Sequence, residues 1–445
     1  MMEAPVLLLN NENFSIIKKY SKRKEYEDAM DYLNNSSDKV LAVSGLRRTG
    51  KTVLLSQLFL ESTEDKCDFL LVENNEPIEN IIKHIDNSNK NIFLIDEVTK
   101  IKNIDDISIL YDKYTKYGKK IIISGTESLL FKILKDYTLY DRVDIIELLP
   151  LPFNEYKRLT DRSLEDYIDN SGLFYGNTDN LLFSVSQNII KSLEKLNGET
   201  SYYNEIIDSM IKILFLKIVW SEELVETLKF SAIGLRKKDV DRINGELMGK
   251  IIKRTPEIKY VNSKDLEEVY EYLVKLRIIT EFESIDRNSR VKKIIPIPGL
   301  LNRIYKQIVQ YCIDNEIFVS QKLVNGLIFE KEMNIQSFLR NPGLPRYTLD
   351  TSSEEVDEII ETDKKVIIVD YRVTNDDELV LSRTNIRKIE EIIEKFEKYF
   401  KKEVNYIVVY KGETKYNKVQ FKNVQEFLNE IEEIDYHKEK VVKWI

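Results

Sequence analysis

Short runs of β-branched and aliphatic residues alternate with amphipathic segments from about residue 39 to residue 148. The runs that predict strands are Val40–Val43, Phe69–Val72, Ile92–Ile95, Ile121–Ile123 and Val143–Leu148. Each gap between them has room for a helix, and strands joined by crossover helices pair in parallel. The pattern therefore predicts an α/β domain in which a parallel sheet carries helices on both faces. The prolines at 150 and 152 end it, because proline cannot donate to a sheet ladder.

The chain becomes mostly helical from about residue 153 to residue 315. Ser263 can cap a helix whose apolar residues recur at helical spacing. The runs Ile278–Phe282 and Val291–Ile295 predict a hairpin across residues 286–288. Helices followed by a hairpin are typical of a winged-helix module, although a helical lid with a β-arm gives the same pattern. We therefore expect a helical, winged-helix-like domain over residues 156–315.

The remaining residues return to a mixed pattern. A helix around Leu323–Leu339 is followed by three predicted strands, a further amphipathic helix and a last strand. The strands are Arg346–Leu349, Val356–Ile360, Val366–Val369 and Tyr406–Tyr410, and the second helix carries Ile389, Ile392, Ile393, Phe396 and Phe400 on one face. The pattern predicts a second α/β domain over residues 316–445.

The length, net charge and cysteine and histidine counts of the chain exclude several classes of protein. At ~150 residues per domain, the 445 residues hold about three domains. The net charge of 67 − 76 = −9 means that any contact with nucleic acid needs a local basic face. Two cysteines and two histidines exclude a disulfide framework and a four-thiolate zinc site. No signal segment or membrane span is expected, and a reducing, cytoplasmic compartment fits best.

The strongest chemical signal is residues 45–52, GLRRTGKT, which fit G-x-x-x-x-G-K-[ST] between a predicted strand and a predicted helix. Glycines at both ends of the loop let backbone N–H groups turn towards phosphate oxygens. Lys51 is expected at the β and γ phosphates of ATP, and the Thr52 hydroxyl at Mg²⁺. The residues predicted to contact the nucleotide in this loop are Gly45, Arg47, Arg48, Thr49, Gly50, Lys51, Thr52 and Val53.

A second signal is the apolar strand that ends in Asp96 and Glu97. Asp96 is expected to bind the magnesium shell, while Glu97 orients and deprotonates the attacking water. The alternative is a buried strand followed by an exposed acidic turn. On the next strand, Ser124 and Thr126 are candidates for contact with the γ-phosphate or the water, or else caps of the following helix. The candidate arginines for the transition state are Arg47, Arg48 and Arg142, from this chain or a neighbour.

These segments resemble the AAA-type ATPases of archaea and bacteria that carry a C-terminal domain of unknown function. The resemblance lies in residues 45–52, LIDEV at 94–98, SGTESLL at 124–130 and DRVDIIELLPLPFNEY at 141–156. It implies a P-loop ATPase domain over residues 1–155, with a sensor residue in the SGT segment and a functional arginine at Arg142.

The C-terminal region is similar in layout to a restriction-endonuclease-like domain. That resemblance implies a degenerate nuclease site formed by Glu330, Asp357, Asp370 and Arg372. In a working nuclease of that type a lysine occupies the last position, where it orients or activates water. Arginine stays protonated and cannot act as a base, although it can bind phosphate. A structural or binding role is expected here in place of cleavage.

The sequence thus predicts an Mg²⁺-dependent ATPase that acts as a nucleotide-driven conformational switch. One alternative is a DNA-binding or regulatory module with slow hydrolysis, in which residues 236–238 and 250–254 meet phosphates, although a solvated helix face is the favoured explanation of those basic residues. Another is a metal-dependent nuclease under the control of ATP. DNA or another protein is a candidate partner, and self-association stays open.

Overall fold

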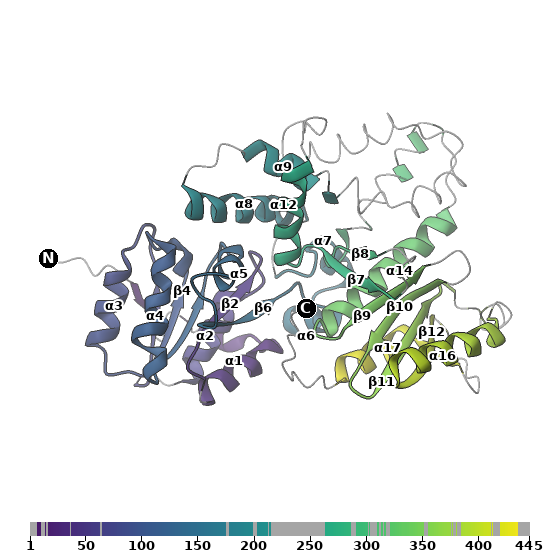
Figure 1. Ribbon diagram of the computed structural model, residues 1–445, viewed down its shortest axis with the longest axis horizontal. Coiled ribbons are helices and arrows are strands. Elements are labelled where there is room, and N and C mark those ends of the chain that lie inside the picture. The colour runs from purple at the N-terminus through teal and green to yellow at the C-terminus, as the bar shows by residue number, and fades with distance from the viewer. Residues whose placement is uncertain are drawn as a thin grey trace. The chain divides into compact units, whose positions relative to one another are not determined.

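The protein is described here by a computed structural model (Figure 1). It describes residues 7–9, 14, 17–35, 37–62, 65–174, 178–198, 203–211, 213–214, 263–285, 291–300, 302, 309–310, 313–314, 316, 321–350, 355–374, 376, 380, 384–410, 412 and 419–434. The chain falls into two compact units, residues 1–213 with 248–277 and residues 214–247 with 278–445. Each unit has its own sheet and its own core. None of the helices in these described ranges is both long and apolar enough to cross a membrane.

The first unit is built on a six-stranded sheet in the order β1-β3-β4-β5-β2-β6. Its strands are β1 (Leu7–Leu9), β2 (Val40–Gly45), β3 (Cys67–Leu71), β4 (Ile92–Asp96), β5 (Lys120–Ser124) and β6 (Val143–Leu148). All pairs are parallel except that of β1 with β3. The five strands predicted from the apolar runs and the parallel sheet are confirmed. The short antiparallel β1 was not predicted.

Helices cover both faces of this sheet, as the sequence predicts. They are α1 (Glu25–Asn34), α2 (Lys51–Glu61), α3 (Ile78–Asn87), α4 (Ser108–Lys113) and α5 (Leu129–Lys135). Along β2 the side chains alternate, because successive residues of a strand point to opposite faces. Leu41 and Val43 pack with α1 and α2, whereas Val40 and Ala42 pack with α3, α4 and α5. The strand ends that carry the candidate site are therefore fixed by two hydrophobic cores.

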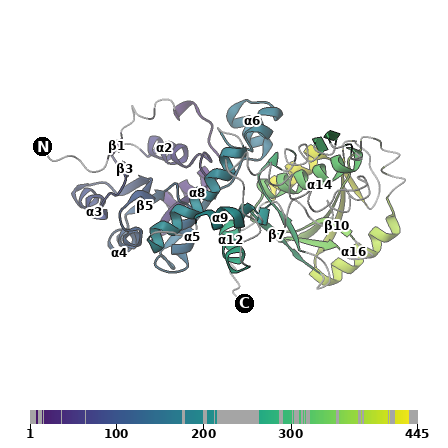
Figure 2. The same cartoon turned by 90° about the horizontal axis from the view of Figure 1, so that it is seen from above.

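Further helices follow β6 within the first unit (Figure 1). They are α6 (Phe153–Thr160), α7 (Leu164–Asp169), α8 (Thr178–Asn197), α9 (Tyr203–Ile211) and α12 (Ser263–Lys275). Helix α8 packs on α5 and on α9, and α12 packs on α9 and α5 (Figure 2). The predicted helix that begins at Ser263 is confirmed. The basic segments at 236–238 and 250–254 lie outside the described residues.

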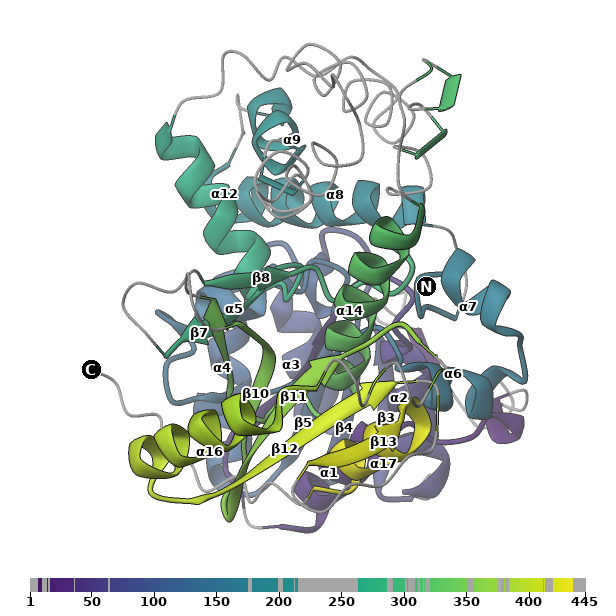
Figure 3. The same ribbon diagram turned by 90° about the vertical axis from the view of Figure 1, so that its right-hand side faces the viewer.

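The second unit contains a seven-stranded sheet in the order β13-β12-β11-β10-β9-β7-β8 (Figure 3). Its elements are β7 (Thr280–Ser284), β8 (Lys292–Ile294), α14 (Gln321–Arg340), β9 (Arg346–Asp350), β10 (Glu355–Glu361), β11 (Lys365–Tyr371), α16 (Ile386–Phe400), β12 (Glu403–Tyr410), β13 (Gln420–Asn423) and α17 (Val424–Glu433). One face packs against α16, and the other packs against α14 and α17. The helices and strands predicted in this region are confirmed, while β13 and α17 were not predicted.

The hairpin β7–β8 belongs to a different domain from the one predicted. Its two strands pair antiparallel as expected, but β7 also pairs in parallel with β9 through Glu283 and Ser284. Its free edge is thus completed by the second sheet, which is why the hairpin belongs to the second unit and not to a winged-helix domain ending at residue 315. Sequence patterns detect a hairpin but not the strand beside it.

Candidate functional site

The loop of residues 45–50 joins β2 to α2 through two glycines with positive φ angles, +150° at Gly45 and +96° at Gly50. A Cβ atom on Gly45 would lie 2.5 Å from the Leu148 carbonyl oxygen, and one on Gly50 would lie 2.9 Å from the Phe174 ring. Only glycine fits both the space and the backbone conformation. The loop therefore has the tight turn that the phosphate-binding motif requires.

Lys51 begins helix α2 and its side chain folds back over the loop. Its Nζ donates hydrogen bonds to the carbonyl oxygens of Gly45 and Leu46, both at 2.9 Å. Burial lowers the pKa of Lys51 to about 8, against the opposing effect of Glu97 and Asp96. The ammonium is thus a weakly solvated cation at the mouth of the loop, which favours exchange of the two carbonyls for phosphate oxygens.

Asp96 lies at the end of β4 and connects two neighbouring elements. The Thr52 hydroxyl donates to its Oδ2 at 2.7 Å, and the Ser124 hydroxyl donates to its Oδ1. A hydroxyl and a carboxylate side by side at the first turn of a P-loop helix fit a magnesium ion that takes its remaining ligands from phosphates and water. Within the described ranges no cluster of three His, Cys, Asp or Glu side chains is arranged to hold a metal ion by itself.

Glu97 follows Asp96 in a left-handed backbone conformation with φ 60°. This conformation is uncommon for a residue with a side chain and is a form of local strain. Its backbone N–H donates to Asp96 Oδ1 at 2.9 Å. The Thr126 hydroxyl contacts both carboxylate oxygens of Glu97, at 2.9 and 2.8 Å. Thr126 thereby fixes the direction in which the Glu97 carboxylate points, and it does not cap the following helix.

Arg23 supports the loop from behind and was missed by sequence reasoning. It is 5% exposed, and its guanidinium donates to the carbonyls of Thr49 at 2.5 Å and Leu149 at 3.2 Å. It also pairs with Glu25 at 3.0 Å. Burial alone would raise the pKa of Glu25, but the charges of Arg23 and Lys24 and the hydrogen bonds to the carboxylate lower that pKa. No local motif marks Arg23, because the loop contacts that it makes are with backbone atoms far away in sequence.

The three candidate arginines lie in different places. Arg47 and Arg48 are exposed on the loop itself. Arg142 precedes β6, and β6 runs parallel to β2 with Val40 beside Val143 and Gly45 beside Leu148. Five residues of strand, at ~3.3 Å each, separate the Arg142 end of the sheet from the loop. Arg142 therefore lies away from the loop of its own chain, so that of the two possibilities left open by the sequence, only a site in a neighbouring chain stays a prediction.

The Arg142 side chain has local partners at that opposite edge. Its Nη1 donates to the Thr138 carbonyl at 2.7 Å, its Nε lies 3.5 Å from Asp112, and its guanidinium faces the Tyr111 ring. A role for Arg142 at a neighbouring chain stays a prediction.

The acidic residues predicted in the second unit do come together. Glu330 lies on α14, and Asp357 and Asp370 lie on the adjacent strands β10 and β11. The Tyr371 N–H donates to Asp357 Oδ2 at 2.6 Å. Burial raises the pKa of Asp357 well above its usual range, and the charges of Glu330 and Asp370 add to this effect. The charges of Glu330 and Asp370 therefore both act on the Asp357 carboxyl group.

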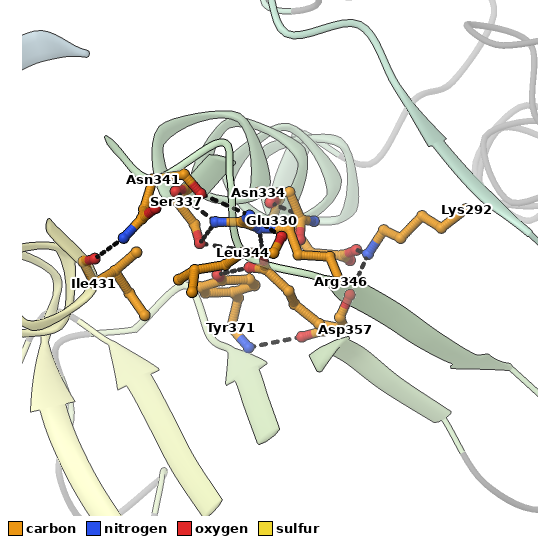
Figure 4. Close-up of polar contacts among 11 residues, drawn as sticks. Lys292, Glu330, Asn334, Ser337, Asn341, Leu344, Arg346, Asp357, Tyr371 and Ile431 are labelled. Carbon is orange, nitrogen blue, oxygen red and sulfur yellow. Dashed lines mark hydrogen bonds and ion pairs between the residues drawn. The ribbon is translucent and has the colours of Figure 1, made fainter. Parts of the chain in front are cut away.

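Lysine and arginine side chains of the chain itself neutralise this group. Lys292 of β8 places its Nζ 2.5 Å from Glu330 Oε1 and 2.8 Å from the Asp357 carbonyl oxygen (Figure 4). Arg372 pairs with Asp370 at 2.5 Å. Burial by itself would raise the pKa of Glu330, but Lys292 and Lys331 lower it to about 2. Sequence reasoning did not find Lys292, since it lies on the hairpin that was expected elsewhere.

The low pKa of Lys51 predicts how nucleotide affinity depends on pH. Binding to a triphosphate favours the ammonium form, so affinity should be constant below about pH 8 and fall as Lys51 loses its proton above that value. We expect the dissociation constant for Mg-ATP to rise several-fold between pH 7 and pH 9. Titration with a fluorescent ATP analogue measures this change. The variant Lys51→Arg should bind without this dependence, and an equal rise in both proteins would exclude Lys51 as its source.

A known domain family matches the part of the sequence that contains the loop of residues 45–50 and the acidic end of β4. Residues 37–157 match the family model described as AAA domain. Among curated proteins, none matches the sequence. This matched segment contains β2 to β6, the loop of residues 45–50 and the acidic end of β4.

The solved structures that resemble this chain do so with low TM-scores and low sequence identities. AMPPCP-bound DnaA from Aquifex aeolicus is 14% identical, with a TM-score of 0.26 over 58% of this chain and 90% of that one. Caenorhabditis elegans PCH-2 is 15% identical, with a TM-score of 0.26 over 60% and 75%. The Thermotoga maritima RuvB Holliday junction branch migration motor is 16% identical, with a TM-score of 0.25 over 68% and 95%. Such scores add nothing to the assignment. Residues 37–157, and with them the candidate site, are thus matched to the AAA domain family.

Proposed function

We propose that the protein is an Mg²⁺-dependent ATPase whose bound nucleotide sets the conformation of the rest of the chain. The observation that carries this proposal is the contact of 2.7 Å between the Thr52 hydroxyl and the Asp96 carboxylate, beside the buried Lys51 ammonium. Lys51 and Thr52 begin helix α2, and Asp96 ends strand β4, 44 residues after Thr52 in the sequence. The match of residues 37–157 to the AAA domain supports the proposal.

Each residue then has one role in hydrolysis. Loop amides and Lys51 bind the β and γ phosphates of ATP. Thr52 and Asp96 hold the magnesium ion, which supplies charge to offset that of the phosphates. Glu97 accepts a proton from the attacking water and is held in place by Thr126. Ser124 orients Asp96, which is the role that the geometry favours over direct contact with the γ-phosphate.

Loss of the γ-phosphate would release the contacts made by Lys51 and by the ends of β4 and β5. Switches of this kind work because one packed arrangement is stable only with the phosphate in place. Helix α8, which follows β6 in the sequence, contacts the turn after β5 through Asn188 and is the part of the first unit placed to respond.

We propose a structural role for the acidic group of the second unit. Lys292 and Arg372 supply the positive charge that a divalent metal would supply in a nuclease. The restriction-endonuclease-like fold of this unit remains a prediction. Binding of DNA through residues 236–238 and 250–254 also remains a prediction, since both segments lie outside the described residues.

The experiment that tests the proposed function is phosphate release from Mg-ATP by the full chain, at several protein concentrations, with and without DNA. We expect turnover that stops when EDTA removes Mg²⁺. A rate per chain that rises with protein concentration would indicate an arginine from a neighbouring chain, and a constant rate would indicate a complete site in one chain. Absence of turnover under every condition would overturn the proposal.

A further inference from the structure

The turns that follow β4 and β5 are locked together by two reciprocal hydrogen bonds. Thr126 of the second turn donates to Glu97 of the first, and Thr99 of the first turn donates to Glu127 of the second at 2.6 Å. Thr99 and Glu127 are both buried. A Cβ atom on Gly125 would lie 2.4 Å from the Thr99 side chain, so the two turns are in close contact. Movement of one turn must therefore displace the other.

Helix α8 contacts the second of these turns through a buried amide. Asn188 is 5% exposed and donates from Nδ2 to the Thr126 carbonyl at 3.0 Å and to Ser128 Oγ at 3.2 Å. Its Oδ1 accepts from the Leu129 N–H at 3.2 Å. One side chain thus satisfies polar groups on three of the four residues from 126 to 129. Figure 2 shows α8 beside α5, the helix that follows these residues.

We infer that Asn188 is a positioning residue for ATP hydrolysis, which sets the Glu97 carboxylate by holding the backbone that carries the Thr126 hydroxyl. This inference rests on the proposed function. The route is short and continuous: the Asn188 amide fixes the Thr126 backbone, and the Thr126 hydroxyl contacts both oxygens of Glu97. It also runs in the reverse direction, because coupling between two sites is reciprocal. A change in the position of Glu97 on hydrolysis should therefore alter the contacts that Asn188 of α8 makes.

The loss of this amide should lower kcat without a matching change in KM. Nucleotide binding depends on Lys51 and Thr52, which Asn188 does not contact in any of its three hydrogen bonds. For Asn188→Ala we expect kcat to fall about tenfold and KM to stay within about twofold. Thr126→Val should lower kcat by a similar factor, since it removes the hydroxyl that Asn188 positions.

The test is a double-mutant cycle in steady-state hydrolysis of Mg-ATP by the full chain. If Asn188 acts through Thr126, the double variant should be no slower than the slower single variant, within about twofold. A kcat that falls by the product of the two single effects would overturn the inference, and so would a wild-type kcat for Asn188→Ala. An increase in kcat for Asn188→Ala would also contradict the inference, because it would mean that the Asn188 contacts hold Glu97 in a less active position.

Ser192→Ala is the matched control. Ser192 lies one turn further along α8, and its buried hydroxyl has no hydrogen-bond partner in the described part of the chain. Its removal should leave kcat unchanged. If wild type and Ser192→Ala hydrolyse ATP while Asn188→Ala also does so normally, only this inference fails. If none of the three proteins hydrolyses ATP, the proposed function fails together with it.

A second measurement covers the case in which Asn188→Ala is poorly folded. Hydrogen exchange in wild type should change in the peptide that contains Leu129 when Mg-ATP is added, because its N–H donates to Asn188. The peptide that contains Asn188 should change as well. Exchange that changes around Lys51 but stays constant in both of these peptides would overturn the inference without any variant.

Discussion

Glu97→Gln should reduce ATP turnover by at least about 100-fold while leaving affinity for Mg-ATP within about threefold. The replacement keeps the size of the side chain and an oxygen that can accept from Thr126, but it removes the group that takes a proton from water. General-base catalysis by a positioned carboxylate is worth about 10²–10⁴ in rate. Single-turnover hydrolysis and equilibrium binding of a fluorescent ATP analogue separate these two effects.

The matched control is Glu79→Gln, which makes the same chemical change on the exposed surface of α3. That variant should hydrolyse ATP as wild type does. Turnover that survives in Glu97→Gln would remove the assigned role of this carboxylate. Loss of both affinity and turnover would instead show that Glu97 supports the shape of the loop.

Lys292→Met should destabilise the second unit by about 3 kcal/mol. Removing one partner of a buried ion pair costs about 3–5 kcal/mol when the other charge is left without compensation. Lys331, 3.7 Å from Glu330, keeps part of that compensation in the variant. Here the side chains of Lys292 and Glu330 are 12% and 16% exposed, which places the effect at the low end. Lys292 also contacts the Asp357 carbonyl, so the variant leaves a second polar group unpaired. Urea denaturation followed by circular dichroism measures the loss.

The loss of stability caused by Lys292→Met should depend on pH, and the lowered pKa of Glu330 determines whether the loss grows or shrinks in acid. Since Lys292 and Lys331 outweigh burial and lower this pKa to about 2, the stabilisation is complete above the ordinary value near 4.5 and is lost as pH falls towards 2. The difference between wild type and Lys292→Met should therefore shrink in acid. Lys293→Met is the control, because its pair with Glu281 is 36% and 41% exposed and contributes less than about 1 kcal/mol. Equal effects of both substitutions would contradict a special role for Lys292.

Short-range patterns in the sequence predicted most of the fold. Five strands of the first sheet follow from runs such as Ile92–Ile95, because a strand buried on both faces is apolar throughout. The sequence also singled out the loop of residues 45–50 and the carboxylates at 96 and 97 as candidates, since each combines a residue pattern with a strand end. The structure places Thr52 and Asp96 in contact, as that interpretation requires.

Contacts between distant segments could not be predicted. Arg142 was assigned to the nucleotide site by resemblance, yet the register of β6 against β2 places it at the opposite edge of the sheet. Lys292 and Arg23 bind groups far away in sequence and have no motif around them. Asn188 lies in an ordinary amphipathic helix, and only its three hydrogen bonds distinguish it. All four placements depend on contacts between distant segments, which are properties of the folded chain.

The central claim is that the loop of residues 45–50 and Lys51 bind the phosphates of ATP while Thr52 and Asp96 hold its magnesium ion. Calorimetric titration of the full chain with Mg-ATP tests it most directly. We predict one binding site per chain, affinity that falls by at least about tenfold in EDTA, and loss of binding in Lys51→Ala. No heat of binding to wild type, or equal affinity in wild type and Lys51→Ala, would contradict the account.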